Sequence, residues 1–447
     1  MATFTPEYLY EILRRLVPPG VSRLSVAYSG GLDSTVLLVA LAHIRDQLGA
    51  DIRALHVDHQ LQAASAEWAE ECARVAGDLN VPFVHLMVEV DDGHEGVEAG
   101  ARAARYAALR RELSAQEVLL TAHHADDQVE TVLLALMRGA GPRGLAASPA
   151  VQCFGPGWLV RPLLDFDRSD LERWAARERL TWVTDPTNES LSFDRNYLRH
   201  EIVAKLRARW PAVARSAVRS AALIQESAQL IEELAEMDLR SIERRGCLEV
   251  DRLEALSAPR RRNLLRYWLR AHGVRAPSAR RLAAIDHDMR VAQADRVPCS
   301  KVEGAEIRRH RGLLYCVPTL PPVPEVLAWE IHTSLELPSR LGALRFEPGT
   351  GSGISPAKLP PTLHVKFRRG GETLKAVGEA HRRSLKKRLQ DANIVPWWRG
   401  RLPLIYAGDR LVAVGDLWVN AEVCAGEDEA GLRIVWDDKP AIHGVEG

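Results

Sequence analysis

The stretch SVAYSGGLDSTVLL, residues 25–38, decides the fold expected of this chain. An apolar run at 24–28 meets Ser-Gly-Gly-Leu-Asp-Ser, and apolar residues then return at helical spacing. This pattern predicts a strand, a tight turn and a helix. Two glycines allow backbone conformations that a Cβ forbids and let a ligand come close. Because the first turn of a helix presents unpaired N–H groups, the turn is predicted to bind an anion such as phosphate.

A carboxylate inside this anion site is its unusual feature. Asp33 would repel a phosphate unless a cation lies between them, which suggests Mg²⁺ with pyrophosphate. Ser29 and Ser34 add hydroxyl donors on either side. No GxxxxGK(S/T) loop occurs in the chain, and this turn is not the GxGxxG loop of dinucleotide sites either. The structural alternative is a tight turn in which Asp33 only caps the helix.

Length and composition set the broad class. With 447 residues, of which 46% are hydrophobic and 26% charged, we expect a globular protein of two or three domains. No apolar run approaches the ~18 residues of a membrane span, and we expect neither a signal peptide nor a membrane partner. The six cysteines are scattered without a CxxC pair, which argues against zinc or iron–sulfur sites and favours a reducing cytoplasm.

The pattern of apolar residues predicts three domains. Short apolar runs at 24–28, 52–57, 83–88 and 117–121 alternate with amphipathic stretches, which is typical of an α/β domain with a parallel sheet. Residues 212–290 are predicted to be helical, with hardly any strand signal. A proline-rich linker at 317–326 precedes a strand-like end that contains a long loop at 346–361. The expected domains are α/β at 1–211, helical at 212–316 and small α+β at 317–447.

A net charge of zero hides three basic stretches. Residues 366–401 contain eleven Lys and Arg against three acidic residues, and further basic stretches lie at 195–219 and 260–281. Basic patches of this kind are typical of binding to a phosphate backbone. The alternative for each stretch is a solvated helix face. Trp397 and Trp398, within the first stretch, are expected to help by stacking on RNA bases.

Two polar clusters follow predicted strands, HVDHQLQ at 56–62 and TAHHADDQVETVLLALMRGAGPRGL at 121–145. The carboxyl ends of parallel strands form the binding crevice, so these clusters are expected to converge with Asp33. Asp127 and Glu130 lie three apart on one helix face, predicted to project away from an apolar stripe of Val129, Val132, Leu133 and Leu136 or Met137. Two carboxylates there could serve a metal, a cationic substrate or proton transfer. A two-metal phosphoesterase is an alternative, but it leaves SGGLDS unexplained.

The SGGLDS turn resembles the SGGxDS mark of the PP-loop ATP pyrophosphatase superfamily, which has the adenine nucleotide alpha hydrolase-like fold. Further blocks narrow the resemblance to the tRNA(Ile)-lysidine synthetase family. These blocks are EAGARAARYAAL (98–109), AHHADDQVET with RGAGPRGLA, RPLLDF (161–166), DPTNESLSFDRNYLRHEIV (185–203) and the basic segment 368–414. The middle region resembles the family only in character. Other tRNA-modifying enzymes of the superfamily, the thiolases, carry a cysteine or CxxC pair near the site, which these blocks lack. A non-enzymatic tRNA-binding protein is a third alternative, but binding alone would not need Asp33.

The resemblance implies a reaction and its residues. ATP would adenylate O2 of the cytidine at the first anticodon position of tRNA(Ile) with a CAU anticodon, and the ε-amine of free L-lysine would then displace AMP at C2. The family also suggests a homodimer. The implied site residues are, for catalysis, Asp33, Asp127, Glu130 and Arg195; for ATP, Ser29, Gly30, Gly31, Leu32, Asp33, Ser34, His56, His59 and Arg105; for Mg²⁺, Asp33; for lysine, Asp127 and Glu130; and for tRNA, Arg138, Arg382, Arg383, Lys386, Lys387 and Arg388.

Overall fold

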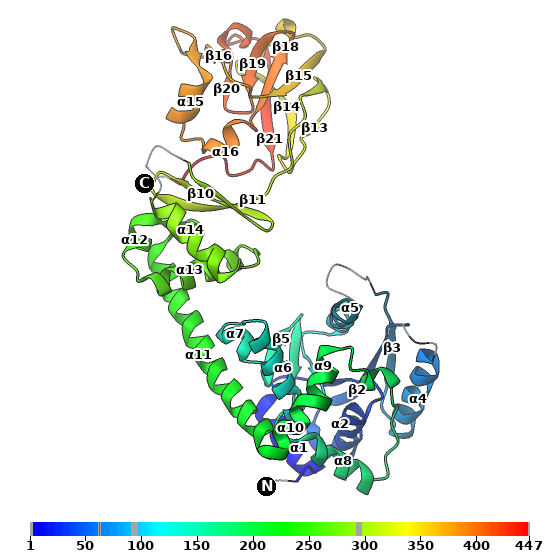
Figure 1. Cartoon of the computed structure of the whole chain (residues 1–447). Helices are drawn as coiled ribbons and strands as arrows, with labels where there is room; N and C mark the ends of the chain where they lie inside the picture. The colour runs from blue at the N-terminus through cyan, green and yellow to red at the C-terminus, as the bar shows by residue number, and fades with distance from the viewer. Residues whose placement is uncertain (1–2, 61, 63, 91–96, 292–296, 446–447) are drawn as a thin grey trace. The chain divides into compact units, whose positions relative to one another are not determined.

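The chain divides into two compact units, Met1–Leu230 and Ile231–Gly447. The computed structural model describes residues 3–60, 62, 64–90, 97–291 and 297–445 (Figure 1). The long helix α11 (Val213–Ile242) contains the boundary between the units. None of the described helices combines the length and the apolarity that crossing a membrane requires.

A six-stranded sheet forms the centre of the first unit, in the order β3-β2-β1-β4-β6-β5. Its first five members in that order are parallel, and β5 is an antiparallel edge strand. The strands are β1 (Arg23–Ala27), β2 (Asp51–Asp58), β3 (Phe83–Met87), β4 (Glu117–Leu120), β5 (Val151–Phe154) and β6 (Gly157–Val160). The four predicted apolar runs therefore correspond to the four parallel strands β1 to β4, which confirms the α/β prediction.

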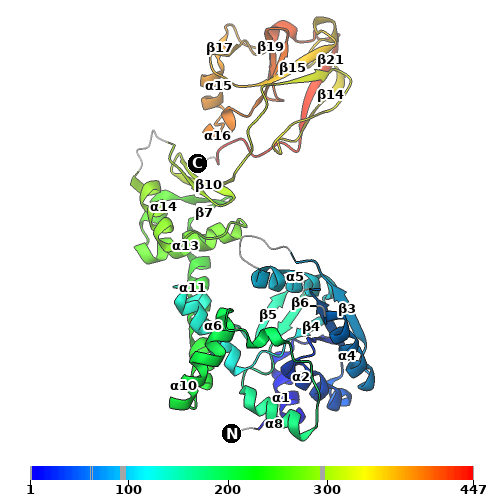
Figure 2. The same ribbon diagram turned by 45° about the vertical axis from the view of Figure 1, so that its right-hand side comes forward.

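Both faces of this sheet are covered, because alternate side chains of each strand enter different apolar clusters. Leu24 and Val26 of β1 pack in one cluster with α1, α2, α4 and α8. Leu55 of β2 and Leu119 of β4 pack in the other with α5. Figure 2 shows these helices around the sheet. The helices are α1 (Pro6–Leu16), α2 (Leu32–His43), α3 (Arg45–Leu48), α4 (Ser65–Asp78), α5 (Val97–Glu112), α6 (Ala125–Met137), α7 (Pro142–Leu145) and α8 (Arg168–Arg177).

Helix α2 is the central helix of this unit. Residues 34–41 are all buried, which explains why its sequence is apolar on every side instead of amphipathic. The chain reaches α2 directly from β1, so the SGGLDS turn lies at the carboxyl edge of the sheet. The same edge receives β4 followed by α6 and, after α8, the segments η1 (Pro186–Glu189), α9 (Asp194–Tyr197), the π-helix η2 (Leu198–Val203) and α10 (Ala204–Arg209).

The middle region contains a sheet that the sequence did not predict. Its helices, α12 (Val250–Glu254), α13 (Ala258–Ala271) and α14 (Ala279–Val291), pack against a five-stranded antiparallel sheet in the order β7-β8-β11-β10-β9. The strands are β7 (Glu243–Arg244), β8 (Cys247–Glu249), β9 (Cys299–Val302), β10 (Ala305–His310) and β11 (Leu313–Pro318). The expectation of a purely helical region was therefore wrong for residues 243–249 and 299–318.

The C-terminal region is α+β, as predicted, around one apolar cluster. It contains a five-stranded sheet, β12-β15-β18-β19-β20, and a three-stranded sheet, β13-β14-β21. The expected loop at 346–361 is partly strand, because β14 continues to Thr350 in register with β21. The elements are β12 (Val326–Glu330), β13 (Leu335–Glu336), β14 (Ala343–Thr350), η3 (Pro356–Lys358), β15 (Thr362–Phe367), β16 (Thr373–Leu374), β17 (Arg383–Ser384), α15 (Leu385–Asp391), α16 (Pro396–Arg399), β18 (Pro403–Ala407), β19 (Arg410–Val414), β20 (Trp418–Val419), η4 (Ala421–Val423) and β21 (Ala430–Asp437).

Candidate active site

The turn after β1 depends on one of its two glycines. Gly30 has φ +81°, and a Cβ there would lie 2.6 Å from Cys72 Sγ and 3.3 Å from Val183 Cγ2. Gly31 has an ordinary φ of −72°, and its nearest foreign atom would be 3.6 Å away. The backbone therefore requires a glycine at 30, whereas at 31 the missing side chain leaves room on the open side of the turn. The expectation that both glycines relieve the backbone was wrong for Gly31.

Segments distant in the sequence hold this turn in place. The backbone N–H of Val183 donates to the Gly30 carbonyl at 2.9 Å. Ser29 Oγ lies 3.1 Å from Ser34 Oγ, and Ser34 Oγ donates to the Gly31 carbonyl at 3.0 Å. Both hydroxyls therefore stand at the first turn of α2, where the helix N–H groups are free to bind an anion. Leu32, by contrast, is buried, so it can contribute only its backbone to ATP.

Asp33 is the carboxylate of this turn, and one of its oxygens has no partner. Among the described residues, no group donates a hydrogen bond to its buried Oδ1. Its Oδ2 lies 3.6 Å from Nε2 of His124, which precedes α6. The side chain is 28% exposed, so it is reachable from the site. A buried carboxylate oxygen without a partner is a group that a bound cation would satisfy.

His124 lies among three carboxylates. Its Nε2 is 3.5 Å from Asp127 Oδ2 as well as 3.6 Å from Asp33, and its Nδ1 is 3.6 Å from Asp126 Oδ2. Burial disfavours the imidazolium, but Asp127 and Asp33 outweigh burial, so the pKa of His124 is raised. These separations are ion-pair distances and not hydrogen bonds, since neither ring nitrogen has a hydrogen-bond partner among the described residues.

The acidic pair predicted on α6 is occupied by two arginines. Glu130 is completely buried and accepts from Arg195 Nε at 2.6 Å and from Arg199 Nε at 2.7 Å. Asp127 Oδ1 accepts from the same guanidinium groups at 3.0 and 3.3 Å. The expectation that Glu130 projects freely away from the apolar side of α6 was therefore wrong, because segment 195–199 covers it. At the end of α6, Leu136 and Met137 are 55% and 73% exposed and do not join an apolar stripe.

The pKa values of Asp127 and His123 are both lowered, but by different causes. Burial alone would raise the pKa of Asp127, but the positive charges of His124 and Arg195 outweigh it, and the pKa of that carboxyl lies far below its usual range. His123, which lies 2.9 Å from Thr121 Oγ1, has its pKa lowered to about 3 by burial. At neutral pH, Asp127 is therefore ionised and His123 is neutral.

The remaining residues expected to bind ATP lie around β2 and α5. His56 is buried, with Nδ1 2.9 Å from the Tyr28 carbonyl, and burial lowers its pKa. His59 is half-buried, and burial and the charge of Arg105 lower its pKa. Burial also lowers the pKa of Arg105, whose guanidinium lies 5.7 Å from the Tyr106 ring centroid. The charge of Arg105 thus acts on His59, whereas His56 supports the backbone beneath the turn.

Cys72 is the one cysteine that contacts the turn within the described residues, and it is not reactive. It is completely buried, and burial raises the pKa of its thiol to about 12. Because the thiolate is the nucleophile of cysteine chemistry, Cys72 packs beside the turn as an apolar group.

Sequence reasoning missed several residues that hold the site together. Arg199 binds the same two carboxylates as Arg195, those of Asp127 and Glu130. Asp126 accepts a hydrogen bond from the Arg168 backbone N–H at 2.9 Å and forms an ion pair with Arg207. Arg207 and Arg215 also approach Asp167, at 3.8 and 3.6 Å. Much of the basic stretch at 195–219 is therefore paired internally. The spacing of Arg195 and Arg199, four residues apart, was the signal that could have indicated one shared helix face.

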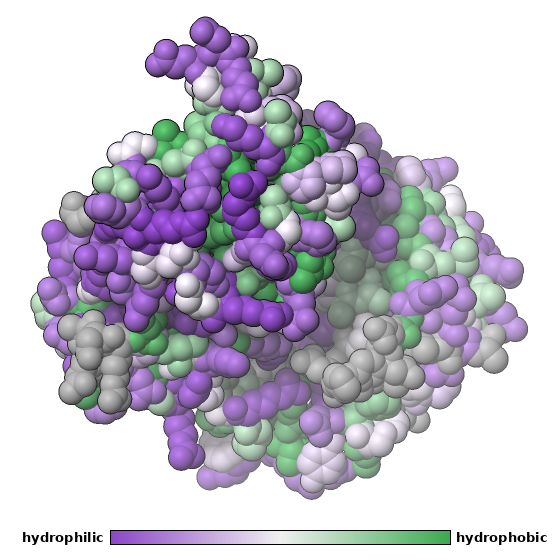
Figure 3. Space-filling view, turned by 90° about the horizontal axis from the view of Figure 1, so that it is seen from above, coloured by the Kyte–Doolittle hydropathy of each residue, from purple (hydrophilic) through white to green (hydrophobic). Residues whose placement is uncertain are grey.

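The residues expected to bind tRNA lie outside this cluster. Arg138 follows α6, roughly 16 Å along the helix from Asp127 at 1.5 Å per residue. It is exposed and has no ion-pair partner among the residues described. The others lie in the second unit. Hydrophilic residues cover most of the face shown in Figure 3.

The basic segment of the second unit is only partly available to a ligand. Lys386 and Lys387 are exposed and unpaired within the described chain, whereas Arg382 pairs with Glu422 and Arg383 with Asp391, both at 2.6 Å. Arg388 is buried and pairs with Glu379, so it cannot belong to the exposed basic surface as expected.

The two tryptophans are not free for stacking either. Trp398 is in the core, and the Trp397 ring packs 4.9 Å from that of Tyr315.

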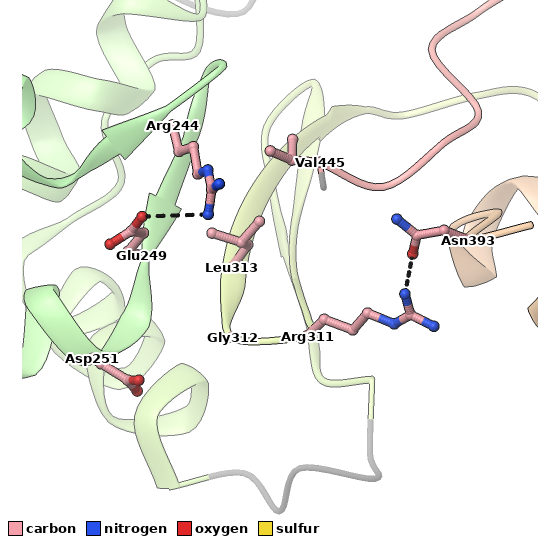
Figure 4. Close-up of a pocket in the computed structure, with 8 residues that line it drawn as sticks. All are labelled: Arg244, Glu249, Asp251, Arg311, Gly312, Leu313, Asn393 and Val445. Carbon is pink, nitrogen blue, oxygen red and sulfur yellow. Dashed lines mark hydrogen bonds and ion pairs between the residues drawn. The ribbon is translucent and has the colours of Figure 1, made fainter. Parts of the chain in front are cut away.

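A cavity of about 650 Å³ lies in the second unit, not at the SGGLDS turn (Figure 4). Its charged lining is largely paired, with Arg244 3.9 Å from Glu249 and Arg311 Nη1 donating to Asn393 Oδ1 at 2.6 Å. Of the described charged residues in this lining, the Asp251 side chain has no hydrogen-bond or ion-pair partner.

Comparison with known proteins gives the same order of domains along the chain. Family models match at residues 5–206 (PP-loop domain), 248–315 (TilS substrate binding domain) and 363–436 (TilS substrate C-terminal domain). Among solved structures, the U34-tRNA thiolase NcsA from Methanococcus maripaludis with its 4Fe–4S cluster covers 49% of this chain and 78% of its own. Its TM-score is 0.41 and its identity 15%, too weak a likeness for comparing sites.

Curated relatives match over nearly the whole chain. The tRNA(Ile)-lysidine synthase of Coxiella burnetii is 40% identical over 97% of this chain and 96% of its own. Those of Pectobacterium atrosepticum and Alkalilimnicola ehrlichii are also 40% identical, over 96% and 99% of this chain and 98% and 99% of their own. Identity at this level over both full lengths shows common descent of all domains together. The chain belongs to the tRNA(Ile)-lysidine synthase family.

Proposed function

We propose that this chain joins free L-lysine to C2 of the cytidine at the first anticodon position of tRNA(Ile) with a CAU anticodon, and that it consumes ATP. It is thus a ligase that forms a C–N bond and releases AMP and pyrophosphate. The observation that carries this proposal is the full-length match to tRNA(Ile)-lysidine synthases, together with a PP-loop whose Asp33 faces the acidic end of α6.

The first step is adenylation of the base. The cytidine O2 attacks the α-phosphorus, an O–P bond forms, and the bond to pyrophosphate breaks. The first turn of α2, with Ser29 and Ser34, holds the phosphates, and His59 and Arg105 line the nucleotide site beside it. Mg²⁺, when bound, would offset the charge of the pyrophosphate. Asp33 fits this ion because its buried Oδ1 has no other partner among the described residues, and a Mg²⁺ held mostly by phosphates needs few protein ligands.

The second step is attack by lysine. The ε-amine loses a proton and forms a bond to C2, and the C2–O bond to AMP breaks. Asp127, ionised and 13% exposed, can hold an amino group of lysine. Its depressed pKa suits a cation-binding group better than a base, because a base must bind a proton readily. Glu130 would act through Arg195 and Arg199, and it would reach lysine directly only if a guanidinium moved away.

Several finer points belong to the same proposal. Residues 1–211 would form the ATP-binding catalytic domain, and residues 212–316 and 317–447 two tRNA-binding domains. The enzyme would act in the cytoplasm as a homodimer. The alternatives are less well supported. For a thiolase, this chain lacks a reactive cysteine at the turn among the described residues, and a phosphoesterase activity does not account for the family match.

The decisive experiment uses labelled L-lysine, ATP and an unmodified tRNA(Ile) transcript with a CAU anticodon. The expected result is label in the RNA, dependent on ATP, with stoichiometric AMP. A transcript whose first anticodon base is uridine is the control and should remain unlabelled. ATP-dependent incorporation of sulfur without lysine would favour the thiolase instead.

A further inference from the structure

The segment that carries Arg195 has two faces with different chemistry. Arg195 and Arg199 are four residues apart and bind Asp127 and Glu130. Phe193 and Tyr197 are also four apart but offset by two residues. Within α9, Tyr197 follows Arg195 by two residues, which at about 100° per residue places it on roughly the opposite side; Phe193, the N-cap residue, lies one turn earlier, and its carbonyl accepts from the Tyr197 N–H at 2.9 Å. The arginine face is therefore turned to α6, and the aromatic face is turned away from it.

The aromatic face is exposed and has no ring partner. Phe193 and Tyr197 are 38% and 48% exposed, and the preceding Leu191 is 49% exposed. Among the described residues, neither ring makes a stacking or cation–π contact, and neither joins an apolar cluster. A group of large exposed apolar side chains at the surface often marks a binding site.

This face is held firmly at the active site. The two guanidinium groups donate to Glu130 and Asp127 at 2.6 to 3.3 Å, and Glu130 is fully buried. Asn196, between the rings, donates through Nδ2 to the carbonyls of Thr187 and Ser190 at 2.9 and 3.0 Å. Figure 1 shows α9 beside α6 in the first unit. The rings are thus positioned by the same contacts that position the acidic pair.

We propose that Phe193 and Tyr197 form a stacking platform for an unpaired base of the anticodon loop, next to the cytidine that is modified. The inference rests on the proposed function. An enzyme that acts on ring atoms of a base must take that base out of its stack, and this leaves a neighbouring base without a partner. Aromatic side chains replace such a partner, since every base offers a flat π face.

The size of the face favours an RNA base over a second copy of the chain. Two rings and one leucine are far smaller than the roughly 800 Å² per partner that a stable protein interface buries. Charged and polar residues, Asp194 and His200, are exposed within the same segment, so the apolar area does not extend further along it. An area of this size fits one or two bases.

The test measures binding of an anticodon stem-loop RNA and the KM for tRNA. Tyr197→Ala and Phe193→Ala should each weaken RNA binding by roughly tenfold, within the range known for base–aromatic stacking. Tyr197→Phe, which keeps the ring, should bind RNA like the unaltered protein. Trp210→Ala is the matched control, because Trp210 is an aromatic residue of the same unit that is 57% exposed and should not affect RNA binding. The KM for ATP should be unchanged in all four variants.

A coupling experiment identifies the base. RNAs with an abasic nucleotide at successive loop positions are bound by the unaltered protein and by Tyr197→Ala. At the stacked position, loss of the base should weaken binding to the unaltered protein but add little to the loss already caused by Tyr197→Ala. Full additivity at every position would overturn the proposal, as would unchanged RNA affinity of both alanine variants.

Other outcomes separate the alternatives. A raised KM for ATP with unchanged RNA binding would assign the rings to adenine, and a changed oligomeric state would assign them to a second copy. Either result overturns the inference but leaves the proposed function intact. Failure of the unaltered protein to transfer lysine would instead overturn the proposed function.

Discussion

At the scale of single residues, the turn after β1 leaves part of the Asp33 carboxylate without a protein partner among the described residues. Its Oδ2 has His124 at 3.6 Å, and its buried Oδ1 has no partner within the described chain. A carboxylate that only capped the helix would occupy the N-cap position, but the N-cap residue of α2 is Gly31, and Asp33 lies two residues further along. The chemical role of Asp33 is therefore better supported than the capping role.

Replacing Asp33 by asparagine should abolish most adenylation and keep the fold. Asparagine has the same shape but no charge, so the cation between Asp33 and pyrophosphate would be lost. We expect ATP-dependent pyrophosphate release to fall by roughly two to three orders of magnitude, as when other preorganised charge-stabilising groups are removed. Asp46→Asn, an exposed aspartate after α2, is the matched control. Near-normal pyrophosphate release by Asp33→Asn would refute the assignment.

Neutralising Glu130 and neutralising Asp127 should have different effects on stability and on the KM for lysine. Glu130→Gln leaves two guanidinium groups buried with one fewer negative charge, and loss of a buried partner costs about 3–5 kcal/mol of unfolding free energy. Asp127→Asn, at a partly exposed site, should cost less stability but raise the KM for lysine more. Urea unfolding and lysine kinetics measure the two effects. Glu172→Gln, in an exposed pair with Arg168, is the control and should cost less than about 1 kcal/mol. Equal stability of Glu130→Gln and Glu172→Gln would contradict the role of Glu130 as the buried partner of Arg195 and Arg199.

At the scale of elements, the sequence predicts what local periodicity determines. Strands β1 to β4 were evident because each is a short apolar run; β1, β2 and β4 are largely buried inside the parallel sheet, whereas β3 is a partly buried edge strand. The middle sheet was missed because β7 and β8 have two and three residues, and β10 reads AEIRRH, in which charged residues interrupt the apolar pattern. Such strands are specified by their partners across the sheet and not by their own sequence.

The same limit applies to the site. The spacing of Asp127 and Glu130 predicted a shared helix face, but only the fold shows that Arg195 and Arg199 cover it. Likewise, the run Lys386-Lys387-Arg388 suggested three surface cations, whereas the helix turns Arg388 inward to Glu379. Sequence spacing predicts which side chains share a face of one helix or strand. Which of those faces is buried depends on how the element packs in the fold.

Strand β10 ends in a histidine that should make the second unit sensitive to acid. Burial, followed by the charge of Arg311, lowers the pKa of His310 to about 4, and its ring lies 6.1 Å from that of Trp397. Between pH 6.5 and 4 the unfolded chain binds a proton that the folded one does not. Stability contributed by this group should therefore fall as the pH falls through that range. The upper limit is about 1.4 kcal/mol per pH unit, reduced here because the ring is only half-buried.

The measurement compares urea unfolding at pH 7 and pH 5, followed by tryptophan fluorescence. His310→Asn should lose less stability between these pH values than the unaltered protein. His287→Asn, on the exposed side of α14, controls for removal of a histidine. Identical pH dependence of His310→Asn and the unaltered protein would show that His310 does not contribute.

At the scale of the whole molecule, 59 basic residues balance 59 acidic ones, and several of the arginines are paired within the fold. Arg195, Arg199 and Arg207 neutralise the carboxylates of the active site, and Arg261 is buried against Asp286 at 2.9 Å. Cations without an ion-pair partner among the described residues are what remains for RNA. They include Arg138 in the first unit and Arg262, Arg266, Lys386 and Lys387 in the second.

Lys386 and Lys387 therefore provide the clearest test of the C-terminal basic surface. Replacing both by alanine should weaken tRNA binding and reduce the salt dependence of log K by up to about 0.9 per lost phosphate contact on duplex RNA, taking the slope known for duplex DNA. ATP binding should not change, and non-cognate tRNAs should lose affinity to the same extent, because phosphate contacts carry no sequence information. The matched control is Arg433→Ala, which removes an exposed but paired cation of the same region. An unchanged salt slope in Lys386→Ala/Lys387→Ala would mean that this surface is only solvated, and that tRNA is held instead by the unpaired arginines of α13.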